Sequence, residues 1–230
     1  MTARASQGAP TLLDQYLPAY DVSDSVATTV NADVATTWEA LLQVDLLDVA
    51  RQHPFVGVLG ALRALPDTVS HVFHGEAPPK TPARMRLRDT AVIPASAGGW
   101  VLLGERPHDE IALGLVGKFW RPVIAFATVR PEAFRDFADP GYGKTIYSLS
   151  VRQIDACHTL LCGVMRTATT DEQARTWFRR YWTLGVGSGA HVLVNGLLDI
   201  VRQDAEAACS RTRDGEPASM PSANVADDQC

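Results

Sequence analysis

The sequence has little lysine and no excess of positive charge, which argues against a nucleic-acid partner. Its 230 residues contain lysine only at Lys80, Lys118 and Lys144, and the formal net charge is −5 at pH 7. Proteins that bind DNA or RNA usually present a basic face, so we expect no nucleic-acid partner. The excess of arginine over lysine is more typical of a biased genomic base composition than of a phosphate-binding device.

Long apolar runs and metal-type cysteine pairs are also absent. No run reaches the roughly 20 apolar residues that a membrane span requires, and residues 1–10 lack the apolar region of a secretory signal. The cysteines Cys157, Cys162, Cys209 and Cys230 do not show C-x-x-C spacing. Cys157 and Cys162 are placed to face each other across a hairpin, where we expect them to be reduced. These absences favour a cytoplasmic protein without a membrane span.

The composition is that of an ordinary globular protein, and both ends of the chain are polar. Hydrophobic residues make up 46% of the chain and charged residues 20%, which is typical of a soluble domain large enough to bury a core. Residues 1–11 and 208–230 have the composition of disordered tails, because little apolar surface is available to offset the entropy of ordering. We therefore expect one domain over residues 12–207.

The strongest structural signal lies between residues 141 and 182. Residues 144–153 alternate Tyr147, Leu149 and Val151 with polar residues, which predicts a half-buried strand. Residues 160–169 predict a returning strand. The run from Thr170 to Gln173 then has a capping-box pattern, with a hydroxyl at the N-cap and Gln three residues later. Apolar residues at helical spacing follow and predict an amphipathic helix.

The remaining segments add strands before this unit and a long helix after it. Residues 31–33 are predicted to end a strand and to cap a helix that carries Trp38, Leu41 and Leu42 on one side. Glycines between Gly185 and Gly189 predict a kink in the last helix. Further strands are expected over residues 20–30, 100–105, 110–119 and 122–129, short helices over 46–50 and 55–65, a turn over 106–109 and loops over 67–98.

This order of elements indicates the fold class. Runs of strands followed by one long helix are typical of α+β proteins, whereas a parallel α/β sheet alternates strands with helices. We therefore expect an α+β fold whose strands form an antiparallel sheet and whose kinked C-terminal helix covers it.

Three segments resemble the START-like (SRPBCC, Bet v 1-like) helix-grip superfamily, and more closely an uncharacterised branch that is common in actinobacteria. They are VNADVATTW (Val30–Trp38), EIALGLVGKFWRP (Glu110–Pro122) and TDEQARTWFRRYW (Thr170–Trp182). With the strands between them they span about residues 20–202. The resemblance implies an antiparallel sheet curved around a long C-terminal helix, with an apolar cavity between them. It also implies binding of a lipid, sterol, polyketide or hormone, or a cyclase or aromatase activity.

One departure from this branch bears on catalysis. Related sequences often carry a polar Thr-Glu-Thr-Arg-like run before the terminal helix, whereas residues Cys162–Arg166 here read CGVMR and keep only the arginine. If the acid of the branch binds or processes a ligand, this chain has lost that group. An acid-dependent reaction is therefore disfavoured.

The candidate ligand site lies among aromatic residues, because aromatics with polar tips suit an apolar cavity that also orients a ligand. We expect the cavity-lining side chains to be Phe119, Trp120, Tyr147, Arg166, Trp177, Tyr181 and His191. The aromatics equally suit a solid core, since protein interiors are close-packed. Arg166 and His191 equally suit a solvent-exposed surface.

Other constellations do not reach the standard of a site. His71, His74 and Glu76 match no metal-ligand spacing. The glycines Gly114 and Gly117 form no nucleotide-binding loop, and the sequence has no G-x-S-x-G elbow for a serine nucleophile. We therefore expect no cofactor and no metal, and we assign no catalytic residue.

These observations lead to one functional expectation with two alternatives. We expect binding or carriage of a small apolar or amphipathic molecule in an internal cavity, with affinity supplied by apolar burial. The first alternative is a polyketide cyclase-like or aromatase-like enzyme in which arginine or tyrosine polarises a carbonyl. The second is a non-catalytic interaction module with a filled cavity. The pattern determines neither the ligand nor the oligomeric state.

Overall fold

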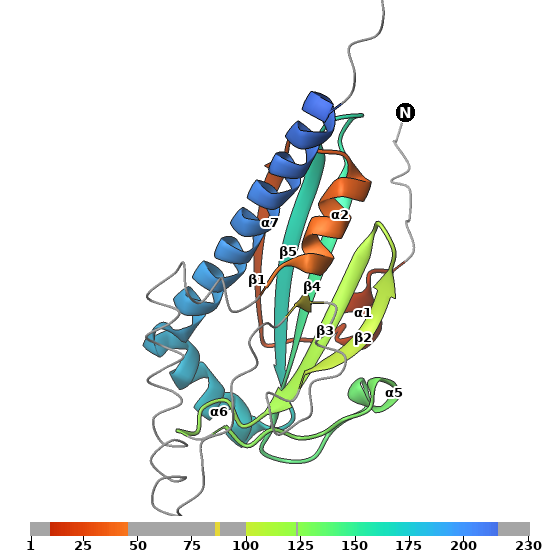
Figure 1. The fold of residues 1–230 in the computed structure, drawn as a ribbon. Coiled ribbons are helices and arrows are strands. Elements are labelled where there is room, and N and C mark those ends of the chain that lie inside the picture. Colours follow the sequence, from red (N-terminus) through yellow and green to blue (C-terminus); the bar gives the residue numbers. More distant parts are fainter. Residues whose placement is uncertain (1–9, 46–85, 88–99, 123, 216–230) are drawn as a thin grey trace, which may run out of the picture.

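The computed structural model describes residues 10–45, 86–87, 100–122 and 124–215 (Figure 1). Within these ranges the chain forms a five-stranded antiparallel sheet with helices on both faces. The strands are β1 (Val22–Val30), β2 (Val101–Arg106), β3 (Glu110–Gly117), β4 (Gly143–Gln153) and β5 (Thr159–Thr169). The helices are α1 (Leu12–Tyr16), α2 (Val34–Gln43), α5 (Pro131–Phe134), α6 (Glu172–Tyr181), the π-helical turn η3 (Trp182–Val186) and α7 (Gly187–Gly215).

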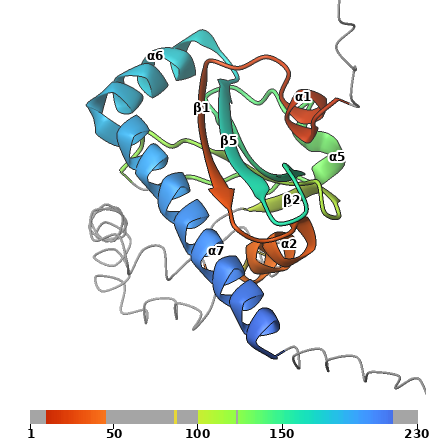
Figure 2. The same ribbon diagram turned by 90° about the horizontal axis from the view of Figure 1, so that it is seen from above.

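The strand order in the sheet is β1-β5-β4-β3-β2, so the first strand pairs with the last. The sheet is curved, and the long C-terminal helix lies along one face of it (Figures 1 and 2). The α+β helix-grip architecture that the sequence predicts is therefore confirmed.

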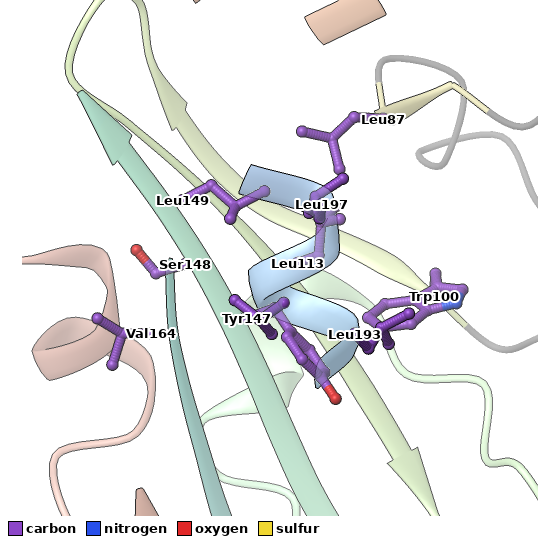
Figure 3. Close-up of a pocket in the computed structure, with 10 residues that line it drawn as sticks. Leu87, Trp100, Leu113, Tyr147, Ser148, Leu149, Val164, Leu193 and Leu197 are labelled. Carbon is purple, nitrogen blue, oxygen red and sulfur yellow. The ribbon is translucent and has the colours of Figure 1, made fainter. Parts of the chain in front are cut away.

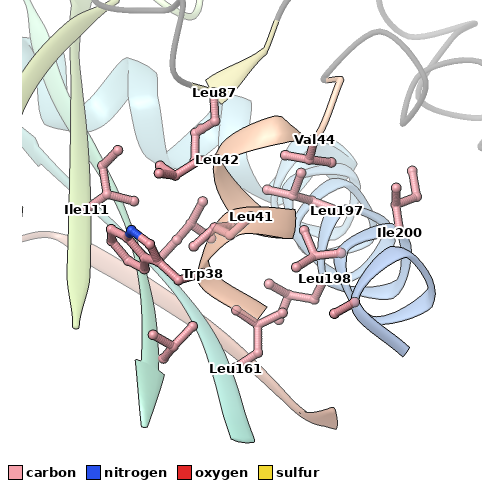
Figure 4. Close-up of a cluster of buried hydrophobic side chains, with 14 of the residues drawn as sticks. Trp38, Leu41, Leu42, Val44, Leu87, Ile111, Leu161, Leu197, Leu198 and Ile200 are labelled. Carbon is pink, nitrogen blue, oxygen red and sulfur yellow. The ribbon is translucent and has the colours of Figure 1, made fainter. Parts of the chain in front are cut away.

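The main core fills the space between the sheet, α2 and α7 (Figure 4). Trp38 and Leu41 from α2 meet Leu161 from β5 and Leu198 from α7, and all four side chains are at most 3% exposed. The expected apolar side of α2 is confirmed. Asp33 caps this helix, because its carboxylate accepts the Thr36 N–H at 2.9 Å.

A second core covers the opposite face of the sheet, where α1 and α5 pack. Residues that alternate with the main-core positions, such as Ile146, are buried there. The prediction that β4 is only half-buried is therefore wrong: Ser148 is 3% exposed and donates to the Glu110 carboxylate at 2.6 Å. The other Glu110 oxygen accepts the Leu12 N–H at 2.9 Å, which ties α1 to the sheet.

The N-terminus of α6 differs from the expected capping box by one residue. The N-cap is Asp171, whose carboxylate accepts the Ala174 N–H at 2.7 Å and also the Gly141 N–H. The Thr170 hydroxyl instead bonds the backbone of Tyr142, so Thr170 still belongs to the sheet side of the junction. The backbone N–H groups of Ala174 and Gly141 lower the pKa of the Asp171 carboxyl.

Two further expectations are corrected. Residues 122–129 form no strand in the described part of the chain, where Gly117 and Phe126 make an isolated bridge; Pro122 has no N–H to donate. Helix α7 continues to Gly215, past the expected tail boundary at residue 208. Just before that boundary, Glu206 accepts two hydrogen bonds from Asn31. The short helices and loops expected between residues 46 and 98 lie outside the described residues apart from Arg86 and Leu87.

The predicted break in the C-terminal helix is confirmed. Leu184 and Gly185 have non-helical backbone angles, and Gly185 adopts φ +100°, which favours glycine. The helical stretch Glu172–Thr212 is long and apolar enough to cross a membrane by length and composition, and 39% of its apolar window is buried within the protein. A core helix has the same composition, so this is weak evidence for a span.

Close contact between α7 and β5 depends on Gly163. A Cβ atom at this position would lie 2.6 Å from Cγ1 of Val194 and 3.3 Å from Cδ2 of Leu149. Real carbon atoms do not approach so closely, and therefore the helix reaches this depth only over a residue without a side chain.

We predict that Gly163→Ala lowers the free energy of unfolding by about 1–3 kcal/mol, because the added methyl group overpacks the core. Chemical denaturation of the single variants Gly163→Ala and Val194→Ala and of the double variant measures the coupling. The double variant is expected to lose less stability than the sum of the single losses. Simple additivity would show that the helix does not press on the strand at this point.

Candidate functional site

An apolar pocket of about 200 Å³ lies between the sheet and α7 (Figure 3). Its wall is almost entirely hydrocarbon. The described residues that line it are Leu87, Trp100, Leu113, Tyr147, Ser148, Leu149, Val164, Leu193, Val194 and Leu197. Ser148 and Val164 are register partners that alternate with the others along their strands, and Figure 3 shows them apart from the main group.

The pocket follows from strand register and helical spacing. Leu113 of β3 pairs with Tyr147 of β4, and Leu149 lies two residues further along the same face. Leu193 and Leu197 are one helical turn apart on α7 and face the same space. Local alternation and the helical repeat therefore bring these side chains to one wall without special loop geometry.

Aromatic side chains form one side of this pocket. Trp100 precedes β2, and its ring centroid lies 5.6 Å from that of Tyr147, with the planes tilted by 60°. Tilted pairs at this distance are favourable for aromatic rings. The pair gives the pocket a rigid wall that ends in the Tyr147 hydroxyl (Figure 3).

The Tyr147 hydroxyl stays protonated well above neutral pH. Burial raises its pKa to about 12, and the negative charges that Tyr181 and Asp24 can carry add to the shift. A neutral phenol donates one hydrogen bond and can accept another. The pocket can thus enclose an apolar group and offer a hydrogen-bond donor to a ligand oxygen.

A cross-strand row leads from Tyr147 across the sheet to a polar pair. Tyr147 pairs with Met165 of β5, and Met165 pairs with Asp24 of β1, so the three residues form one cross-strand row. At the end of the row Asp24 Oδ2 lies 2.9 Å from Nδ1 of His191 on α7. The His191 side chain is 52% exposed, and thus this pair lies at the rim and not in the pocket wall.

The other expected site residues are dispersed. Of the seven candidates only Tyr147 lines the apolar pocket. Phe119 is buried against Gly117 and Gly143, and Trp120 and Trp177 line a second, more exposed pocket beside α6. Tyr181 packs against Phe178, and its phenolate, once formed, adds to the raised pKa of Tyr147.

The expectation that Arg166 lines the cavity is wrong. Arg166 pairs in register with Ile146, a residue of the second core, and therefore points to the face opposite Tyr147. Its guanidinium donates to Asp14 Oδ1 at 2.7 Å, lowers the pKa of that carboxyl and lies over the Tyr20 ring at 4.6 Å. Arg166 and Tyr147 cannot act on the same carbonyl from opposite faces of the sheet.

The sequence-based choice of aromatic residues missed most of the actual wall. Trp100 directly precedes β2, Leu113 and Leu149 come from strands, and Leu193 and Leu197 come from one face of α7, where they are one helical turn apart. The sequence signal that could have predicted this wall was the face of α7 that carries Leu193 and Leu197, combined with the period-two alternation of apolar residues around Tyr147.

No metal site is apparent in the described part of the chain, which contains no group of three or more His, Cys, Asp or Glu side chains arranged to hold an ion. His71, His74 and Glu76 lie outside the described residues. Cys157, Cys162 and Cys209 are free thiols, and burial raises the pKa of the Cys162 thiol.

Comparisons with known proteins assign no family. No known family model matches the chain, and no curated protein matches it in sequence. A hypothetical protein from Helicobacter pylori aligns at 10% identity over 86% of this chain and 98% of its own, with a TM-score of 0.38.

Two further solved structures align at similar levels. A protein from Arthrobacter aurescens shows 10% identity over 79% of this chain and 86% of its own, with a TM-score of 0.34. CalU16 from Micromonospora echinospora shows 12% identity over 83% and 88%, with a TM-score of 0.25. Similarities of this size carry no argument about function, which has to come from the pocket itself.

We predict that Tyr147 ionises later than an exposed tyrosine, with a pKa of about 12. Because an unfolded chain releases this proton near pH 10, the folded state loses stability as the pH rises from about 10 towards 12. The tyrosinate absorbance of the native protein and of Tyr147→Phe measures the difference. The variant is expected to lack the late step and the corresponding alkaline destabilisation. An unchanged titration curve in the variant would contradict the assignment.

Proposed function

We propose that this protein binds a small, largely apolar molecule in the pocket between the sheet and α7. The observation that carries the proposal is the combination of an almost wholly hydrocarbon wall with one protonated hydroxyl, that of Tyr147. Apolar burial contributes affinity at about 25 cal/mol per Å². The hydroxyl then orients the ligand through an oxygen acceptor.

The pocket volume limits the size of the ligand. An apolar cavity of about 150 Å³ is enough to hold benzene, whereas drug-sized ligands occupy about 300–1,000 Å³. The 200 Å³ bounded by the described residues therefore fits one ring, two fused rings or a short branched chain. A polyketide with four fused rings would exceed it.

The resemblance to the START-like superfamily supports the same proposal, because enclosure of a ligand between sheet and terminal helix is what that resemblance implies. It does not support a reaction that uses Arg166 together with Tyr147, since Arg166 pairs with Asp14 on the other face. The cytoplasmic location is likewise a proposal, and it rests on composition.

We predict that naphthalene raises the thermal unfolding midpoint, because a ligand that binds only the folded state stabilises it. Leu193→Phe is expected to remove most of this shift by filling the pocket. Val192→Phe is the matched control, since Val192 is the preceding residue on α7, is 36% exposed and does not line the pocket. Pyrene, with four fused rings, is expected to give no shift.

The hydroxyl is tested separately. 2-Acetylnaphthalene is expected to bind more tightly than naphthalene, and Tyr147→Phe is expected to remove about three- to tenfold of that preference, the value of one hydrogen bond. Mass spectrometry of the gently purified protein under non-denaturing conditions shows whether a natural ligand is retained. Equal shifts in Leu193→Phe and Val192→Phe would place binding outside this pocket and overturn the proposal.

A further inference from the structure

A second surface lies at one end of the molecule, where α6 meets the loop that leaves β3 (Figure 1). Two large apolar side chains are exposed on this stretch of helix: Trp177 is 48% exposed and Leu184 is 84% exposed. Isolated apolar side chains on a surface need no explanation, but several on one face mark an interaction site. The arrangement of the neighbouring side chains shows whether Trp177 and Leu184 are isolated or form part of an interaction site.

The exposed residues of α6 share one side of the helix. Ala174 and Phe178 face the core, and both are at most 2% exposed. Trp177 and Arg180 are three residues apart, which places them on a common face, and Leu184 lies in the π-helical turn that continues α6. The Arg180 guanidinium lies 5.4 Å from the Trp177 ring centroid, and hence the aromatic and the basic group are adjacent.

The helix break leaves Leu184 projecting into open space. Gly185 follows it with φ +100°, and a Cβ at Gly185 would find no atom within 4 Å. Leu184 is thus the most exposed of the large apolar side chains in the described part of the chain.

A shallow pocket of about 290 Å³ extends this face towards the β3 loop. It places Trp120 and Arg121 beside Trp177, with Lys118 at its base over the Tyr142 ring at 4.5 Å. We call the following group the docking face: Lys118, Trp120, Arg121, Trp177, Arg180 and Leu184.

The docking face carries an excess of positive charge on an acidic protein. It holds three cations beside Asp171, the acid that lines its pocket, whereas the whole chain has a net charge of −5. The Ala174 N–H and the Lys118 ammonium lower the pKa of the Asp171 carboxyl. The charges of Lys118 and Asp171 therefore offset each other, and Arg121 and Arg180 carry the excess. The face is therefore complementary to an anionic partner in charge and offers tryptophan and leucine for apolar contact.

We propose that the docking face binds the surface of a membrane that contains anionic lipids. Tryptophan is favoured at the level of lipid headgroups, and basic residues near the surface are attracted by anionic lipids. In this arrangement Trp177 and Leu184 enter the interface while Arg121 and Arg180 contact lipid phosphates. The proposal concerns a surface distinct from the apolar pocket and does not rest on ligand binding there.

The test is sedimentation of the full chain with vesicles of phosphatidylcholine alone and of phosphatidylcholine mixed with phosphatidylglycerol. The protein is expected to bind the mixed vesicles, to bind phosphatidylcholine at least tenfold more weakly, and to dissociate as salt screens the charges. Arg180→Glu and Leu184→Asp are each expected to weaken binding to mixed vesicles by about tenfold or more. Both positions are exposed, so the thermal midpoint is expected to stay near that of the parent protein.

Matched controls lie at the opposite end of the sheet. Arg152 is exposed near the end of β4, and Ile154, which is 55% exposed, lies in the turn that follows. Arg152→Glu and Ile154→Asp make the same chemical changes there and are expected to leave vesicle binding within about twofold of the parent protein. Absence of binding to anionic vesicles, equal binding to both vesicle types, or equal losses in the control variants would each overturn the proposal.

Discussion

The whole architecture depends on how closely α7 can lie on the sheet. The helix meets β5 over Gly163, where Val194 occupies the space that a side chain would take. That contact sets the depth of the main core, in which Leu198 and Leu161 are fully covered. It also sets the height of the pocket, because Leu193 directly precedes Val194 and Leu197 follows it by about one turn along the same helix. The position of α7 therefore accounts both for the tight contact at Gly163 and for the pocket beside it.

The side chains that line the pocket differ in length, which leaves a space between them. The large rings of Trp100 and Tyr147 pack on each other at one side of the pocket, and the shorter side chains of Leu113 and Leu149 line it beside them. Close packing is the rule in protein interiors, so an apolar space of this size costs stability unless something fills it. This cost is one physical argument for the proposed ligand.

The fold was largely predictable from the sequence, whereas the site was not. Strands β4 and β5 begin one residue before the boundaries that alternation predicts, and the glycine break at Gly185 and the cap at Asp33 lie where the sequence places them. These features depend on neighbours within a few residues. Which face of the sheet a strand residue serves depends instead on packing between distant segments. Arg166 and Tyr147 looked equivalent as strand residues, yet α1 covers one and α7 the other.

Burial on both faces explains the other differences. Polar positions such as Ser148 suggested a solvent face, but α1 covers them, and Glu110 satisfies the hydroxyl. The pocket residues themselves are mostly leucines, which carry no chemical signature in a sequence. Only the register between Leu113 and Tyr147, together with the face of α7, singles them out.

The pairing of the first strand with the last has a consequence for synthesis of the chain. Among the strands of the described structure, β1 pairs only with β5. Val22 pairs with Thr167, which lies more than half the sequence further along the chain. The apolar positions of β1 therefore remain without their partners until the ribosome has released β5 and α7. Such distant pairing slows folding and leaves an unpaired strand exposed meanwhile. The serine, aspartate and threonine residues of β1, which occur on both sides of the strand, make it a poor template for aggregation while it is unpaired.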